Sequence, residues 1–231
     1  MNKKCNLKDS IVNNANKYAI FNPHTLAPVV KNGDKIVGIF IDPAIKTCAM
    51  RIAENNRSTN EVKTLVQVLL DFRCNETEFA TSGTSYYFNC FDILDTYKDY
   101  FINSHYIIME HQSTRASYNV IRISQQILSY FLSTVRDKGC RPLIIEIDPH
   151  LKSSFFNIPR MKKPLLKKRT TEIAINILKE RGENELANKI EKISKNDDHG
   201  DTICYEFLWW EILKENKVNL CVKKKSRFIL S

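Results

Sequence analysis

Acidic residues close two apolar runs that lie far apart in the sequence, and this pairing constrains the fold more than any other feature. Asp42 follows the run at 36–41, and Glu110 follows the run at 106–109. A carboxylate at the end of a buried strand costs free energy unless a positive partner joins it. A divalent metal ion is the simplest such partner, and it predicts phosphoryl-transfer chemistry.

A third acidic segment precedes a strongly apolar helical pattern near the C-terminus. It contains Asp198 and Asp201, which are three residues apart and therefore share one face of a helix. Carboxylate oxygens suit Mg²⁺, for which Mn²⁺ is a substitute. Two such ions about 4 Å apart can activate an attacking water and stabilise a leaving 3′ oxygen. The four acids together predict a metal-dependent phosphodiester hydrolase.

Each acid taken alone also has a structural explanation. Asp42 precedes a proline and could begin a turn, and Glu110 could pair at the surface with a base such as Arg115. The pair at the helix start could cap the helix or interact with its dipole. To replace a functional site, all of these separate structural explanations would have to be correct together in a basic protein. We therefore favour the interpretation that the four acids form one metal-binding site.

Other polar residues compete for roles in this site. Asp197 is an alternative to Asp198, and His199 could assist proton transfer, contact phosphate, or simply be exposed in the first helical turn. Glu146 and Asp148 end the last predicted strand. We leave both out of the site, because that strand should lie farther from the central pair.

The order of the patterns predicts an α/β fold. Short gaps favour an antiparallel meander, and a strand–helix–strand succession favours a parallel crossover. We expect a mixed five-stranded sheet in the order 3-2-1-4-5, flanked by helices, with the first strand central and the fourth beside it in parallel. Two acid-bearing strand ends then meet at one edge. The predicted strands are 35–42, 47–54, 63–73, 105–110 and 142–147, and the predicted helices are 88–100, 115–138, 165–181, 183–193 and 198–215.

Composition narrows the partners and the compartment. The 231 residues carry a formal net charge of +9. This charge favours a polyanionic partner, such as nucleic acid or an acidic membrane surface, and solubility alone is the alternative explanation. The seven cysteines are odd in number and lack a C-x-x-C pair, so we expect a reducing, intracellular location without disulfides or a zinc site. The polar N-terminus and short apolar runs predict no signal peptide and no membrane partner.

One basic segment, residues 151–169, is the main candidate for DNA contact. It has no acid, and its cations would attract phosphates; a solvated surface is the alternative. Phe155 and Phe156 could stack on bases or pack in a core, and we expect one of the adjacent Trp209 and Trp210 to face outward. The predicted DNA-binding residues are Lys46, Arg115, Arg122, Lys152, Arg160, Lys162, Lys163, Lys167, Lys168 and Arg169.

The segments 38–47, 107–112 and 197–201 resemble the three acidic motifs of RuvC-like Holliday junction resolvases, nearest to the poxvirus and large cytoplasmic DNA virus branch and the fungal mitochondrial enzymes. The resemblance implies an RNase H-like fold, a homodimer joined through the helix at 115–138, and Mg²⁺-dependent nicking of four-way DNA. It makes all four acids metal ligands. The family often has Gly where this chain has Ala44, and Asn where it has Thr47.

We therefore predict a structure-selective endonuclease that makes paired symmetric nicks in four-way junctions during viral recombination and concatemer resolution. Its location would be cytoplasmic viral replication sites if the chain is viral. The alternatives are an RNase H-like nuclease on another branched or hybrid substrate and a non-catalytic junction-binding module. An actin-like ATPase is disfavoured, and no nucleotide cofactor is expected, because the turn after Asp42 has no Gly-rich sequence. We predict an N-terminal extension at 1–34, a nuclease domain at 35–217 and a basic tail at 218–231.

Overall fold

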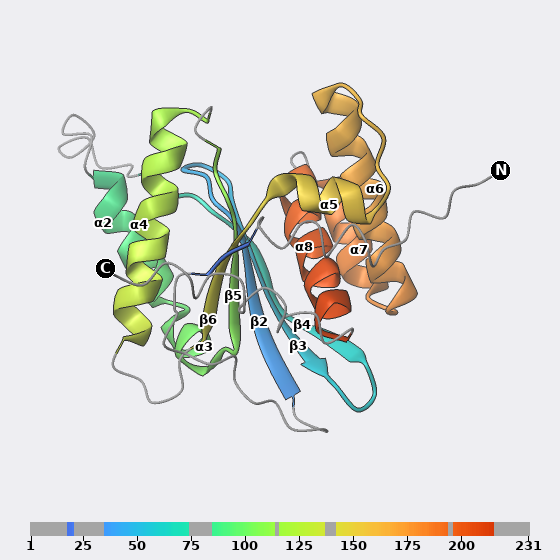
Figure 1. The fold of residues 1–231 in the computed structure, drawn as a ribbon, viewed down its shortest axis with the longest axis horizontal. Coiled ribbons are helices and arrows are strands. Elements are labelled where there is room, and N and C mark those ends of the chain that lie inside the picture. The colour runs from blue at the N-terminus through green and yellow to red at the C-terminus, as the bar shows by residue number, and fades with distance from the viewer. Residues whose placement is uncertain are drawn as a thin grey trace, which may run out of the picture.

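The apolar runs of the sequence form one mixed sheet in the computed structural model (Figure 1). The structure describes residues 18–20, 35–73, 85–113, 116–136, 142–193 and 196–214. The sheet has the order β1-β6-β5-β2-β3-β4. Its strands are β1 (Tyr18–Ile20), β2 (Lys35–Asp42), β3 (Cys48–Asn56), β4 (Glu61–Leu70), β5 (Tyr106–Glu110) and β6 (Leu143–Ile147).

Five of these strands confirm the predicted topology. β2, β3 and β4 form an antiparallel meander, whereas β2 pairs with β5 and β5 with β6 in parallel. β2 is therefore central, and the order of β2 to β6 is the predicted 3-2-1-4-5. The sequence did not predict the edge strand β1, which pairs antiparallel with β6. Of the predicted N-terminal extension only this strand is described, and the predicted tail lies outside the described residues.

Helices cover both faces of the sheet (Figure 1). On one face, α2, α3 and α4 bury apolar side chains against the strands. On the other, α5 and α8 pack on the sheet, and α6 and α7 pack against α8. No helix in the described part of the chain is long and apolar enough to cross a bilayer. The helices are α2 (Ser85–Asp95), α3 (Lys98–Asn103), α4 (Tyr118–Val135), α5 (Pro149–Phe155), α6 (Lys163–Glu180), α7 (Asn184–Lys192) and α8 (Asn196–Lys214).

Several details differ from the sequence predictions, among them helix α5, which the sequence did not predict. The single helix predicted at 88–100 is the pair α2 and α3. The expectation that one tryptophan faces outward is wrong, because Trp209 and Trp210 are only 2% and 3% exposed. Both can be buried because α8 lies between the sheet and α6, which leaves it almost no solvent-facing side. The apolar stripe of α4 packs in the core, so it does not by itself indicate a dimer interface.

Candidate metal-binding site

Three acidic side chains converge at the edge where β2 and β5 end. The parallel register pairs Ile41 with Met109, so Asp42 and Glu110 follow at neighbouring strand ends. Asp201, in the second turn of α8, completes the group, and one carboxylate oxygen from each residue lies within 4.8 Å of the others. This spacing suits a divalent cation bridged by hard oxygen ligands.

The fourth predicted ligand lies beside this group without joining it. Asp198 is one helical turn before Asp201 and accepts a hydrogen bond from the Thr47 side chain. Its charge also raises the pKa of Asp42, although less than Glu110 and Asp201 do. A role as ligand therefore stays a prediction for all four acids, with Asp198 placed at the margin of the cluster.

Electrostatics show why a cation suits the cluster. Burial is the largest cause that raises the pKa of Asp42, and the carboxylates of Glu110 and Asp201 raise it further. Burial likewise raises the pKa values of Glu110 and Asp198. Like charges held together out of water resist ionisation unless a positive partner is present. The donor set therefore fits a divalent metal.

A buried lysine contributes a positive charge from within the protein. Lys152 on α5 is 6% exposed, and its ammonium group pairs with Asp201 and lies 4.8 Å from the ring centroid of Tyr205. The Tyr205 hydroxyl donates a hydrogen bond to Glu110. Burial lowers the pKa of Lys152, but the charges of Asp201 and Glu110 outweigh burial, so the group stays protonated. Its place inside the acid cluster distinguishes it from the exposed cations of residues 151–169, with which the sequence grouped it.

The competing acids have structural partners instead. Helix α8 begins at Asn196, so Asp197 could have shared a face with Asp201, but its carboxylate pairs with Lys167. Glu146 is buried and pairs with His111, whereas Asp148 caps α5 by accepting a hydrogen bond from the backbone of His150. The structure thus leaves these three residues outside the group of converging carboxylates.

His199 is buried beside β4. It is 5% exposed, so the alternative of an exposed first-turn histidine is wrong. Its Nδ1 lies 2.8 Å from the Gln67 side-chain nitrogen, and burial is the main cause that lowers the pKa of His199 to about 4. A neutral ring accepts this bond from the amide, which gives His199 a role in holding α8 against β4.

We expect His199 to make the protein less stable in acid. The unfolded chain binds a proton on this ring near its ordinary pKa of 6.5, whereas the folded chain resists protonation down to about 4. Stability from this group is therefore present above pH 6.5 and is lost as the pH falls towards 4. His199→Asn keeps a hydrogen-bond acceptor but does not titrate, so its thermal midpoint should fall less than that of the unaltered protein between pH 6.5 and 4. The control is His150→Asn at an exposed histidine, and its thermal midpoint should fall as much as that of the unaltered protein. Parallel losses in all three proteins would contradict this role.

The sequence did not reveal the polar network that joins α8 to the sheet. Arg51 is completely buried, and its guanidinium donates to Glu206 at 3.0 Å, to Gln67 at 2.9 Å and to Thr64 at 2.8 Å. Arg181 also donates to Glu206, at 2.7 Å. The available signal was a charged residue between Met50 and Ile52 in an apolar strand, because burial of such a residue requires partners.

Most of the predicted DNA-binding cations are on the surface. Arg122 is exposed, and its guanidinium lies 4.9 Å and 5.2 Å from the ring centroids of Tyr87 and Tyr118. Phe155 and Phe156 pack against Phe207 and are not free stacking platforms. Arg115 lies outside the described residues. The exposed predicted contacts are Lys46, Arg122, Arg160, Lys162, Lys163, Lys167, Lys168 and Arg169.

Solved structures share this arrangement. The yeast mitochondrial Holliday junction resolvase Ydc2 aligns with a TM-score of 0.58 and 17% identity, over 85% of this chain and 88% of its own. The fowlpox virus resolvase in complex with substrate Holliday junction DNA aligns with a TM-score of 0.53 and 16% identity, over 77% of this chain and 99% of its own. RuvC of Thermus thermophilus aligns with a TM-score of 0.50 and 10% identity, over 78% of this chain and 97% of its own. These likenesses confirm the predicted RuvC-like, RNase H-like fold. No family model and no curated protein sequence matches the chain.

Proposed function

We propose that this protein is a Holliday junction resolvase, a structure-selective endonuclease that nicks four-way DNA junctions symmetrically with a divalent metal. The observation that supports the proposal most is the convergence of Asp42, Glu110 and Asp201 at one edge of a sheet whose fold is that of resolvases. Mg²⁺ is the proposed metal, and Mn²⁺ is its proposed substitute.

The acids and their neighbours would divide the work of the site. Asp42, Glu110 and Asp201 would hold the metal, and Asp198 could complete its coordination or bind a second ion. When bound, the metal supplies Lewis-acid stabilisation and an activated water for phosphodiester hydrolysis. Tyr205 fixes the orientation of Glu110, and Lys152 offsets negative charge beside Asp201.

Substrate binding would use the exposed cations that flank this edge. α6 follows α5, which carries Lys152, and Lys167 of α6 pairs with Asp197, the neighbour of Asp198, so the exposed cations of α6 begin beside the acids. A homodimer would present two equivalent sites for opposing strands of a junction. We propose that this chain binds DNA through these cations and acts as a homodimer. We also propose that it acts inside the cell, and at viral replication sites if the chain is viral.

The function is tested with purified protein on matched DNA substrates. Four-way DNA, duplex, flap and RNA–DNA hybrid are incubated at one salt concentration with Mg²⁺ or with EDTA. We expect paired symmetric nicks confined to the junction, with none in EDTA. Equal cutting of plain duplex would contradict junction selectivity, and preferred cutting of hybrid or flap would identify a different RNase H-like nuclease. Junction binding without cutting would indicate a non-catalytic module.

The basic segment carries its own prediction. Lys167 and Lys168 are exposed on α6, and changing both to Ala should weaken junction binding and make its salt dependence shallower. The slope of log affinity against log salt should fall by about 1 to 2, roughly 0.9 for each lost phosphate contact. The matched control changes Lys189 and Lys192 on α7. An unchanged slope in the first variant would remove α6 from the DNA-binding surface.

A further inference from the structure

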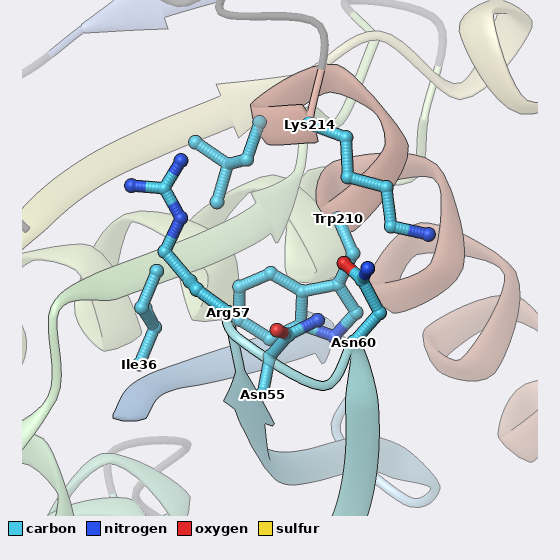
Figure 2. A pocket seen from close by; sticks show the side chains of 7 residues that line it. Ile36, Asn55, Arg57, Asn60, Trp210 and Lys214 are labelled. Carbon is cyan, nitrogen blue, oxygen red and sulfur yellow. The ribbon is translucent and has the colours of Figure 1, made fainter. Parts of the chain in front are cut away.

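A cavity lies at the end of β2 and α8 opposite the acid cluster. It is a cavity of about 360 Å³ between the β3–β4 hairpin, the start of β2 and the last turns of α8 (Figure 2). Asp42 ends β2 and Asp201 lies near the start of α8, so both elements run from the acids to this cavity. The lining residues are Ile36, Asn55, Arg57, Asn60, Trp210, Leu213 and Lys214.

One wall of the cavity is a fixed indole ring with an unmet hydrogen bond. Trp210 is 3% exposed, and its Nε1 is buried without a partner in the described part of the chain. Phe40 packs edge-on against this ring. A Cβ added at Gly38 would lie 2.8 Å from the ring, so a larger residue at position 38 would displace it. The ring is thus held in place by packing rather than by a hydrogen bond, and it gives the cavity a rigid apolar wall.

Two carboxamides provide hydrogen-bonding groups next to the indole. Asn55 is 5% exposed at the end of β3, and Asn60 lies across the hairpin with a left-handed backbone at φ 58° (Figure 2). Each amide offers both a donor and an acceptor. The two amides beside the indole ring match the edge of a planar polar group, as a nucleobase presents.

The charge of the lining is positive. Arg57 and Lys214 stand on opposite sides of the indole, and no acidic residue is among the lining residues (Figure 2). Lys214 also pairs with Glu211, which lies outside the lining. Two cations around a small polar cavity favour an anionic ligand, and phosphate accepts several hydrogen bonds from such groups.

We propose that this cavity binds one nucleotide, with its phosphate near Arg57 and Lys214 and its base against Asn55, Asn60 and Trp210. The volume is within the range of small-ligand sites. The nucleotide could be free in solution or part of single-stranded DNA. The site is separate from the acid cluster and requires no metal, so its binding can be measured whether or not the protein cleaves junctions.

The test is a titration of the full chain in EDTA, by calorimetry and by the fluorescence of its two tryptophans. The probes are deoxynucleoside monophosphates, the corresponding deoxynucleosides, inorganic phosphate and a short single-stranded oligonucleotide. We expect saturable binding of the monophosphates, with weaker binding of the nucleosides and of phosphate alone. Tighter binding of the oligonucleotide would identify DNA as the source, and equal binding would identify free nucleotide.

A variant that introduces a negative charge locates the site. Asn60→Asp keeps a residue that tolerates the left-handed backbone, removes an amide that contacts the base and adds a negative charge to a cavity that binds an anion, so nucleotide affinity should fall roughly tenfold. Asn157→Asp is the matched control, since Asn157 is exposed and also left-handed, at φ 51°. Absence of saturable binding, equal affinities of the two variants, or phosphate binding as tightly as the nucleotide would overturn the proposal.

Discussion

The Asp42→Asn variant should bind four-way DNA as tightly as the unaltered protein and cleave it roughly 1,000-fold more slowly. Asp42 lies where the central strand ends, and the charges of Glu110 and Asp201 both raise the pKa of its carboxyl group. An amide has nearly the same shape but carries no negative charge for a metal. The measurement is a single-turnover cleavage rate on a labelled junction, combined with a binding titration in EDTA.

The same substitution should not weaken the fold. Asp42 carries a buried charge among like charges, and removing that charge relieves the repulsion when metal is absent. The thermal midpoint of the metal-free variant should therefore equal or exceed that of the unaltered protein. Glu54→Gln, on the neighbouring strand β3, removes an acid that pairs with Lys35 and should leave cleavage unchanged. Substantial residual nicking by the Asp42 variant would exclude its role as a metal ligand.

The second large effect is expected at Lys152. Changing this lysine to methionine keeps much of its apolar stem but removes the buried cation beside Asp201 and Glu110. Breaking a buried ion pair leaves uncompensated charge, so the free energy of unfolding of the metal-free protein should fall by about 3 kcal/mol at neutral pH. Cleavage should fall roughly 100-fold, since the site loses one of its positive charges.

The pH dependence distinguishes this mechanism from a general packing defect. Glu110 and Asp42 already have raised pKa values, and loss of Lys152 raises them further. When folding raises the pKa of an acid, the folded state loses stability as the pH rises from the acid's ordinary pKa to its raised pKa. The deficit of the variant should thus shrink in mild acid and on addition of Mg²⁺.

A matched control uses an exposed lysine of the same length. Lys179 lies 4.0 Å from Glu191 at the surface, and Lys179→Met should change stability by only about 0.5 kcal/mol. Denaturant titrations with and without Mg²⁺ over a range of pH give all of these values. If the Lys152 variant is as stable as the unaltered protein without metal, the buried lysine does not neutralise the acids.

The sequence predicted the parts of the site that depend on strand order. Asp42 and Glu110 follow apolar runs, and a parallel neighbour brings such ends together, as the pairing of Ile41 with Met109 confirms. The helical spacing of Asp198 and Asp201 also placed them on one side of α8. These relations are periodic and local, so a single sequence contains them.

The remaining features depend on how the layers pack. Lys152 looked like one of several cations in an acid-free segment, and only the position of α5 over the sheet edge directs it to the acids. Arg51 needed partners from β4 and α8 that are distant in sequence. The burial of both tryptophans required α6 to cover the outer side of α8, which no property of α8 alone predicts.

The most direct test of the central claim is a crystal structure of the protein grown with Mn²⁺, with data collected at the manganese absorption edge. The anomalous map should show one or two ions between Asp42, Glu110 and Asp201, with Asp198 within coordinating distance of one of them. Lys152 should then lie beside the ions rather than between the acids. A fully ordered acid cluster without anomalous density at saturating Mn²⁺, or ions bound only elsewhere, would contradict the proposed metal-dependent chemistry.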